Sequence, residues 1–111
     1  MFSGNKEVEK TDIHAYFASN QNWIQTFLTE LLQIPSESGK EQAAVEYVRE
    51  RFSSIGADCV LVPVNENIVK HREYSDPIKG IAYAGRSNLK VTVPGKSGGI
   101  IALNTHADVV P

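Results

Sequence analysis

The first third of the chain carries apolar residues at helical spacing. The opening ten residues are mostly polar and show no period, so we expect a loose arm over 1–10. From Thr11, a candidate N-cap, one stripe of apolar side chains predicts a single helix over 11–33, ahead of Pro35. The weak point is SNQN at 19–22, whose side chains compete for backbone hydrogen bonds and could split the helix in two. The stripe consists of Ile13, Phe17, Ile24, Phe27, Leu28 and Leu31.

A second helix is signalled at both of its ends. Ser38 and Glu41 have the spacing of a capping box, in which each side chain bonds to a backbone N–H at the start of the helix. Gly56 stands where a left-handed residue commonly ends a helix. The predicted apolar face between these signals is formed by Ala44, Val48, Phe52 and Ile55.

The remainder of the chain has the pattern of strands and turns. Valines alternate with other residues over 57–64, and Pro63 places this strand at a sheet edge because proline cannot donate to the ladder. Leu89, Val91 and Val93 alternate with polar residues and predict a strand with one solvated face. The connection over 65–87 has no clean period, so it is either a functional loop or hides a short strand at 81–84.

The segment IIAL at 100–103 is apolar throughout and follows the turn PGKSGG at 94–99. An all-apolar strand is normally covered on both faces, so we expect it near the centre of a sheet. Two helices followed by a small sheet predict an α/β fold, with one domain over 11–111 after the arm.

Composition excludes several classes of function. The 111 residues include 11 basic and 13 acidic side chains, for a net charge of -2, and no basic block suits nucleic acid. No apolar run approaches the roughly 20 residues needed to cross a bilayer, so we expect no membrane partner. Cys59 is the only cysteine and precludes an internal disulfide. Its valine-rich surroundings favour an inert thiol, and we expect a cytoplasmic protein.

The candidate chemistry lies directly after the predicted central strand. In an extended chain His106 and Asp108 point to the same side, at the end of the strand where α/β proteins bind ligands. A neutral imidazole can ligate zinc while a carboxylate accepts the proton of its other ring nitrogen. His-x-Asp also occurs by chance, and a histidine bonded at a strand end beside a turn-capping Asp108 explains the spacing equally well. His14 and His71 stand among polar residues and are expected on the surface.

Three stretches in order carry a family resemblance. They are LLQIPSESGKE before the second helix, NLKVTVPGKSGG around the second strand, and LNTHADVVP at the end. From about Trp23 to Pro111 the sequence resembles the start of the zinc-dependent exopeptidase and deacylase family. That family includes carboxypeptidase G, aminoacylase, acetylornithine deacetylase and succinyl-diaminopimelate desuccinylase. The three stretches together are more specific than any one alone.

The resemblance implies a metal ligand and a catalytic partner. In that family the signature histidine binds one of two zinc ions, and the aspartate two residues later holds the histidine and supports catalysis. His106 is therefore the expected zinc ligand and Asp108 the expected catalytic residue. The implied reaction is metal-assisted hydrolysis of an amide bond in a small peptide or N-acyl amino acid.

The family's other metal ligands and its catalytic glutamate follow the signature and cannot be assigned in this chain. One histidine and one supporting carboxylate do not hold catalytic zinc tightly. We therefore expect an incomplete N-terminal part of a zinc-exopeptidase-like α/β domain, inactive as a hydrolase by itself. We also expect self-association through the edge of the apolar strand. The alternatives are a non-catalytic binding or interaction domain derived from that fold, and a site completed by another chain.

Overall fold

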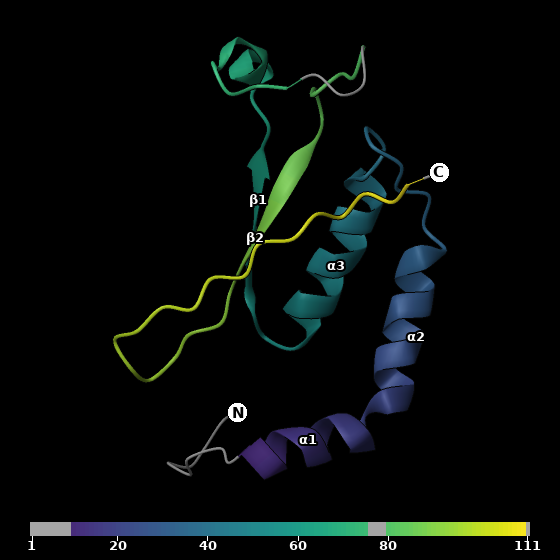
Figure 1. Cartoon of the computed structure of the whole chain (residues 1–111), viewed down its shortest axis with the longest axis vertical. Coiled ribbons are helices and arrows are strands. Elements are labelled where there is room, and N and C mark those ends of the chain that lie inside the picture. Colours follow the sequence, from purple (N-terminus) through teal and green to yellow (C-terminus); the bar gives the residue numbers. More distant parts are fainter. Residues whose placement is uncertain (1–9, 76–79, 111) are drawn as a thin grey trace. The chain divides into compact units, whose positions relative to one another are not determined.

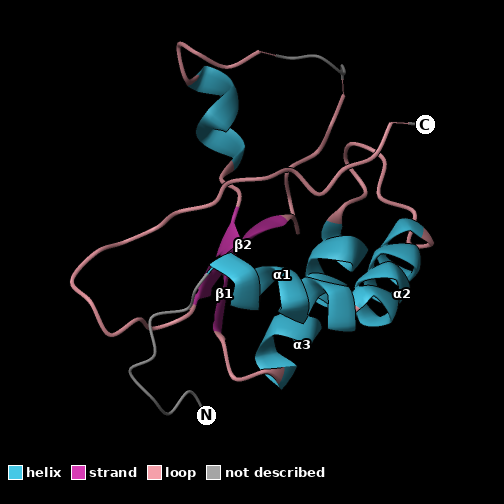
Figure 2. Cartoon of the chain, turned by 60° about the horizontal axis from the view of Figure 1, so that its bottom comes forward, coloured by secondary structure: helices cyan, strands magenta, loops and turns pink. Residues whose placement is uncertain are grey.

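The computed structural model describes residues 10–75 and 80–110, which divide into the units Met1–Glu30 and Leu31–Pro111. Figures 1 and 2 show the elements, which mix helix and strand. Over the described residues there are three α-helices and a two-stranded antiparallel sheet. None of these helices is long and apolar enough to cross a membrane. The arm predicted over 1–10 lies, except for Lys10, outside the described residues.

The single long helix predicted over 11–33 is wrong, because the chain forms α1 (Lys10–Ser19) and α2 (Gln21–Leu32). The break falls at Asn20, inside the predicted weak point. Ser19 Oγ donates to the carbonyl of Ala15 at 2.9 Å, and Asn20 Nδ2 donates to that of Tyr16 at 2.8 Å. These side chains take backbone acceptors at the end of α1, as their type predicts.

The second predicted helix is α3 (Gln42–Ser54), and its C-terminal signal is confirmed. Gly56 has φ +84°, and its N–H donates to the carbonyl of Ser53 at 3.0 Å. The next N–H, from Ala57, donates to the carbonyl of Phe52 at 3.1 Å. This pair of bonds is the Schellman arrangement, which needs a left-handed residue and therefore favours glycine.

The predicted capping box at the other end of α3 is wrong. The N-cap position is Glu41, and no side chain caps the helix there. The predicted apolar face is only partly correct, because Ala44 is fully buried whereas Ile55 is 68% exposed. Ala44 and Val45 are the only buried hydrophobic residues in the described part of the chain, so this core is small.

Strands β1 (Asp58–Pro63) and β2 (Ser87–Thr92) confirm two of the predicted strands. They pair antiparallel, with Cys59 opposite Val91 and Leu61 opposite Leu89. These four residues are half-buried and share one face, and α3 contacts both strands. Figures 1 and 2 show α3 beside the hairpin. The helix and the half-buried face of the sheet thus make one small layered unit.

The connection between the strands contains a short 3-10 helix, η1 (Glu66–Lys70), rather than a strand at 81–84. Residues 81–83 have no regular structure, and β2 begins only at Ser87. Tyr74 and Tyr83 share a hydroxyl–hydroxyl hydrogen bond of 2.9 Å across this connection. The long loop is therefore closed on itself by side chains.

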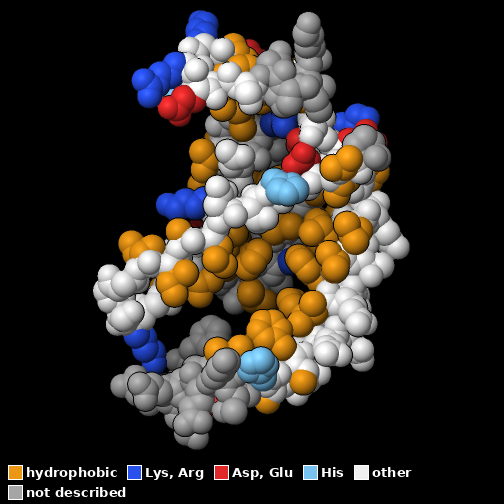
Figure 3. Space-filling view, viewed as in Figure 1, with side chains coloured by type: hydrophobic (Ala, Val, Ile, Leu, Met, Phe, Trp, Pro, Cys, Tyr) orange, Lys and Arg blue, Asp and Glu red, His pale blue; other side chains and the backbone are white. Residues whose placement is uncertain are grey.

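The central strand predicted at 100–103 is not formed. Ile100, Ile101 and Leu103 are 93%, 92% and 95% exposed, and the segment has no ladder partner among the described residues. Figure 3 shows hydrophobic side chains exposed along the course of this segment. An apolar strand is stable only between neighbouring strands and covering layers, and the described residues supply neither.

Candidate functional site

The structure brings the side chains of His106 and Asp108 together. The Nδ1 atom of His106 lies 3.0 Å from Asp108 Oδ1 and 3.0 Å from the backbone oxygen of the same residue. The backbone here is not the extended strand that was predicted, although the two side chains still meet. With its proton on Nδ1, the ring donates to Asp108 and keeps the lone pair on Nε2.

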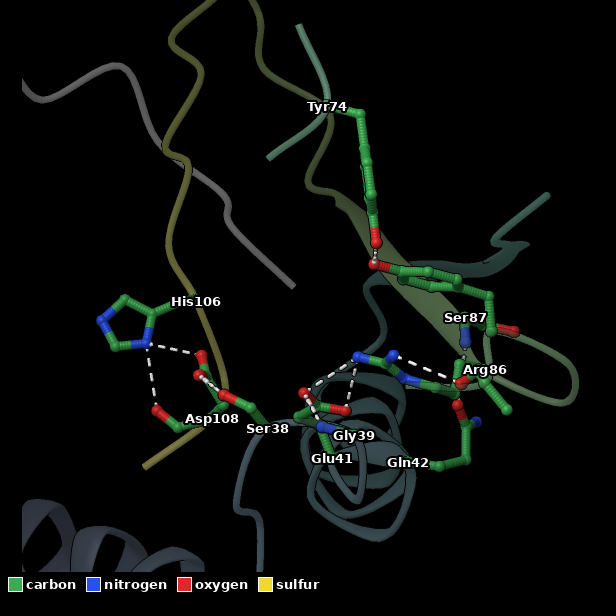
Figure 4. Close-up of polar contacts among 11 residues, drawn as sticks. Ser38, Gly39, Glu41, Gln42, Tyr74, Arg86, Ser87, His106 and Asp108 are labelled. Carbon is green, nitrogen blue, oxygen red and sulfur yellow. Dashed lines mark hydrogen bonds and ion pairs between the residues drawn. The ribbon is translucent and has the colours of Figure 1, made fainter. Parts of the chain in front are cut away.

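A serine from the loop before α3 donates a hydrogen bond to the other oxygen of the Asp108 carboxylate. Ser38 Oγ donates to Asp108 Oδ2 at 2.6 Å, a short bond typical of a hydroxyl donating to a charged acceptor. Figure 4 shows Asp108 between the imidazole on one side and the Ser38 hydroxyl on the other. Both oxygens of the carboxylate therefore have a side-chain partner.

The backbone holds these two segments in register. The N–H of Val109 donates to the carbonyl of Ser36 at 2.9 Å, and Glu37 and Val109 form an isolated parallel bridge. Ser36 is only 2% exposed. Segment 36–38, which leads toward α3, is thus fixed against segment 108–109.

The hydrogen bonds favour the ionised form of the Asp108 carboxyl. The bond from Ser38 is the largest influence and lowers the pKa of Asp108 below its ordinary value. Partial burial opposes this shift, and the hydrogen bond from His106 adds to the lowering. An ionised carboxylate only accepts hydrogen bonds, which suits it to hold the Nδ1 proton of the imidazole.

A charged pair supports the loop that carries Ser38. Glu41 Oε1 accepts the N–H of Gly39 at 2.7 Å, and Arg86 Nη2 lies 2.9 Å from each oxygen of the same carboxylate. The guanidinium of Arg86 also lies 5.0 Å from the ring centroid of Tyr83. Figure 4 shows Arg86 reaching the Glu41 carboxylate beside Gly39. Arg86, at the end of the long connection, thereby helps to hold the loop that carries Ser38 next to the His106–Asp108 pair.

Sequence reasoning missed the roles of Ser38 and Glu41, which it assigned to a capping box. Their spacing suggested local bonds to the start of the helix, but Ser38 bonds to a residue 70 positions away and Glu41 to one 45 positions away. Sequence spacing carries no signal for either partner.

The His106 ring keeps one nitrogen accessible to a ligand. The His106 side chain is 83% exposed, and Figure 4 shows its second ring nitrogen pointing away from Asp108. Across residues 10–75 and 80–110, no three His, Cys, Asp or Glu side chains are grouped so that they could hold a metal ion. His14 and His71 are exposed, as predicted. Any metal ion bound by His106 would therefore need further ligands from outside the described residues.

Comparison with known proteins identifies no relative of this chain. No protein family, no curated protein and no solved structure matches the chain.

Proposed function

We propose that His106 and Asp108 supply one zinc ligand and its orienting carboxylate to a metal-dependent amidohydrolase site. The observation that carries this proposal is the contact from His106 Nδ1 to Asp108 Oδ1 at 3.0 Å, with the rest of the ring exposed. A metal-binding histidine typically donates its second ring N–H to a carboxylate, which fixes the tautomer and strengthens the ligand. The resemblance of the surrounding sequence supports zinc as the metal.

Each residue has a defined part in this site. Bound zinc would activate a water molecule and polarise the amide carbonyl of a small peptide or an N-acyl amino acid. His106 would bind through Nε2. Asp108 would keep the Nδ1 proton in place and balance the positive charge that metal binding places on the ring. Two zinc ions are expected in the complete site, and the remaining ligands would belong to residues that the structure does not describe.

The test compares the hydrolytic activity of this chain alone with that of a protein that also supplies the other metal ligands. Purified residues 1–111 are expected to show no zinc-dependent hydrolysis of dipeptides or N-acetyl amino acids, because the described ligands are too few. A longer protein containing this chain and the missing ligands is expected to show hydrolysis that a chelator abolishes and zinc restores. In that protein His106→Ala should remove activity, and the matched control His71→Ala should preserve it. Full activity of the His106→Ala variant would refute the proposal.

One observation favours a second candidate, a non-catalytic interaction domain. Ile100, Ile101 and Leu103 are all more than 90% exposed, and apolar side chains grouped in this way are typical of a surface that binds another protein. On this reading His106 and Asp108 form an ordinary surface hydrogen bond. Zinc binding that requires His106 supports the hydrolase, whereas zinc-independent protein binding that is lost in Ile101→Lys supports the interaction domain.

A further inference from the structure

We propose that Ser38 is a positioning residue that holds Asp108 in the orientation from which it fixes the tautomer of His106. This inference rests on the proposed function and extends its site by one residue. The geometry that carries it is a continuous chain of hydrogen bonds, 2.6 Å from Ser38 Oγ to Asp108 Oδ2 and 3.0 Å from Asp108 Oδ1 to His106 Nδ1.

The arrangement assigns Ser38 a positioning role rather than a nucleophilic one. A nucleophilic serine needs its hydroxyl bonded to a base that accepts the proton, usually an imidazole. Here the hydroxyl donates to a carboxylate, and the imidazole lies on the opposite side of that carboxylate. Ser38 therefore acts through Asp108 and has no contact with His106 in this chain of bonds.

The Asp108 side chain needs such a partner because one contact does not fix the plane of its carboxylate. Rotation about the last side-chain bond of aspartate is broad, with two equivalent orientations. A donor on each oxygen selects one plane, so the orientation of Oδ1 toward Nδ1 depends on what holds Oδ2. Ser38 is the donor on Oδ2.

Ser38 is itself held in place from both sides. The residue two positions before it accepts the Val109 N–H at 2.9 Å, and the N–H of Gly39 donates to Glu41 at 2.7 Å. A side chain on a fixed loop loses little conformational entropy when it bonds, which is how a supporting residue preorganises a ligand. The hydrogen bond between Ser38 and Asp108, which are 70 positions apart, thus helps to orient the ring of His106.

The same chain contains an internal reference for the measurement. The N–H of Glu73 donates to Nδ1 of His71 at 3.3 Å, so that nitrogen is an acceptor and the His71 proton lies on Nε2. In the neutral rings, His106 and His71 are therefore expected to show opposite tautomers. Nitrogen-15 NMR of the imidazole rings distinguishes the two forms directly.

The experiment compares variants of the 111-residue chain at one pH, about 8.5, where an ordinary imidazole is neutral. Ser38→Ala is expected to lower the ratio of Nδ1–H to Nε2–H at His106 by about fivefold, the effect of losing one ordinary hydrogen bond. The Asp108 backbone oxygen, 3.0 Å from Nδ1, keeps part of the preference in this variant. Ser38→Thr, which keeps the hydroxyl, should retain the ratio. Ser54→Ala removes a hydroxyl that donates to the Arg51 carbonyl at the opposite end of α3 and should have no effect. An unchanged ratio in Ser38→Ala would overturn the proposal.

A second measurement applies if Ser38→Ala does not fold. In the wild-type chain the Ser38 hydroxyl proton should exchange slowly with water and show a nuclear Overhauser effect to the Cβ protons of Asp108. Absence of that contact would also overturn the inference. Added Zn²⁺ tests the proposed function separately, through a shift of His106 Nε2 that exceeds the shift at His71. If zinc has no selective effect while Ser38→Ala still changes the tautomer, the metal assignment fails and the positioning role stands.

Discussion

The ion pair between Glu41 and Arg86 is expected to stabilise the fold far more than a surface pair would. Its side chains are only 15% and 21% exposed, and Arg86 Nη2 lies 2.9 Å from each carboxylate oxygen. Two unit charges about 4 Å apart attract by about 4 kcal/mol at an effective dielectric constant of about 20, and desolvation offsets part of this. Charge-assisted hydrogen bonds contribute about 1.5–3 kcal/mol each. We therefore expect a coupling free energy of about 2 kcal/mol between Glu41 and Arg86.

A double-mutant cycle with Glu41→Gln and Arg86→Gln measures this coupling from urea unfolding curves. Glutamine at position 41 keeps an oxygen for the Gly39 N–H, and the contact of Arg86 with the Tyr83 ring cancels in the cycle. The matched control is the Glu46–Arg49 pair of α3, which has a similar 2.8 Å separation but side chains that are 35% and 42% exposed. Exposed helix pairs couple by about 0.3–0.5 kcal/mol. Equal coupling for the two pairs would refute the reasoning from burial.

Three further changes test other parts of the structure. Gly56→Ala is expected to lower the free energy of unfolding by about 1–2 kcal/mol through backbone strain alone, since a Cβ there meets nothing within 4 Å. The matched control is Gly98→Ala, because φ at Gly98 is not positive. It should change the free energy of unfolding, measured by urea titration for both variants, by less than about 1 kcal/mol. Because the pKa of Asp108 is lowered in the folded chain, its stabilisation should be complete above about pH 4 and lost as the pH falls through the folded value. Asp108→Asn should then reduce the loss of stability between about pH 6 and pH 2 in urea titrations, and an unchanged loss would contradict the assignment. Ile101→Lys should reduce self-association in sedimentation velocity, and a wild-type chain that stays monomeric at high concentration would contradict the exposed-segment prediction.

The sequence alone predicted the elements whose determinants are local. The left-handed residue at Gly56 is required by the end of α3 itself. The alternation predicted over 57–64 and around Leu89 matches the two-residue repeat of β1 and β2, although Cys59 and Leu61, rather than the valines, form the half-buried face of β1. Ser19 and Asn20 bond to carbonyls four residues earlier, and the predicted weak point in the first helix was therefore detectable. The pairing of His106 with Asp108 belongs to this class too, because the two residues are only two positions apart.

The tertiary structure decided where polar side chains find partners distant in sequence. Ser38 has capping-box spacing, but the N-cap of α3 is Glu41, and the Ser38 hydroxyl donates to Asp108, which only the fold brings near. Glu41 likewise bonds to Arg86 as well as to the nearby Gly39. Segment 100–103 has the composition of a central strand and still lies exposed, since burial depends on neighbours that a segment cannot provide for itself. Periodicity reports what a segment prefers, whereas its partners are set by which other segments the fold brings within reach.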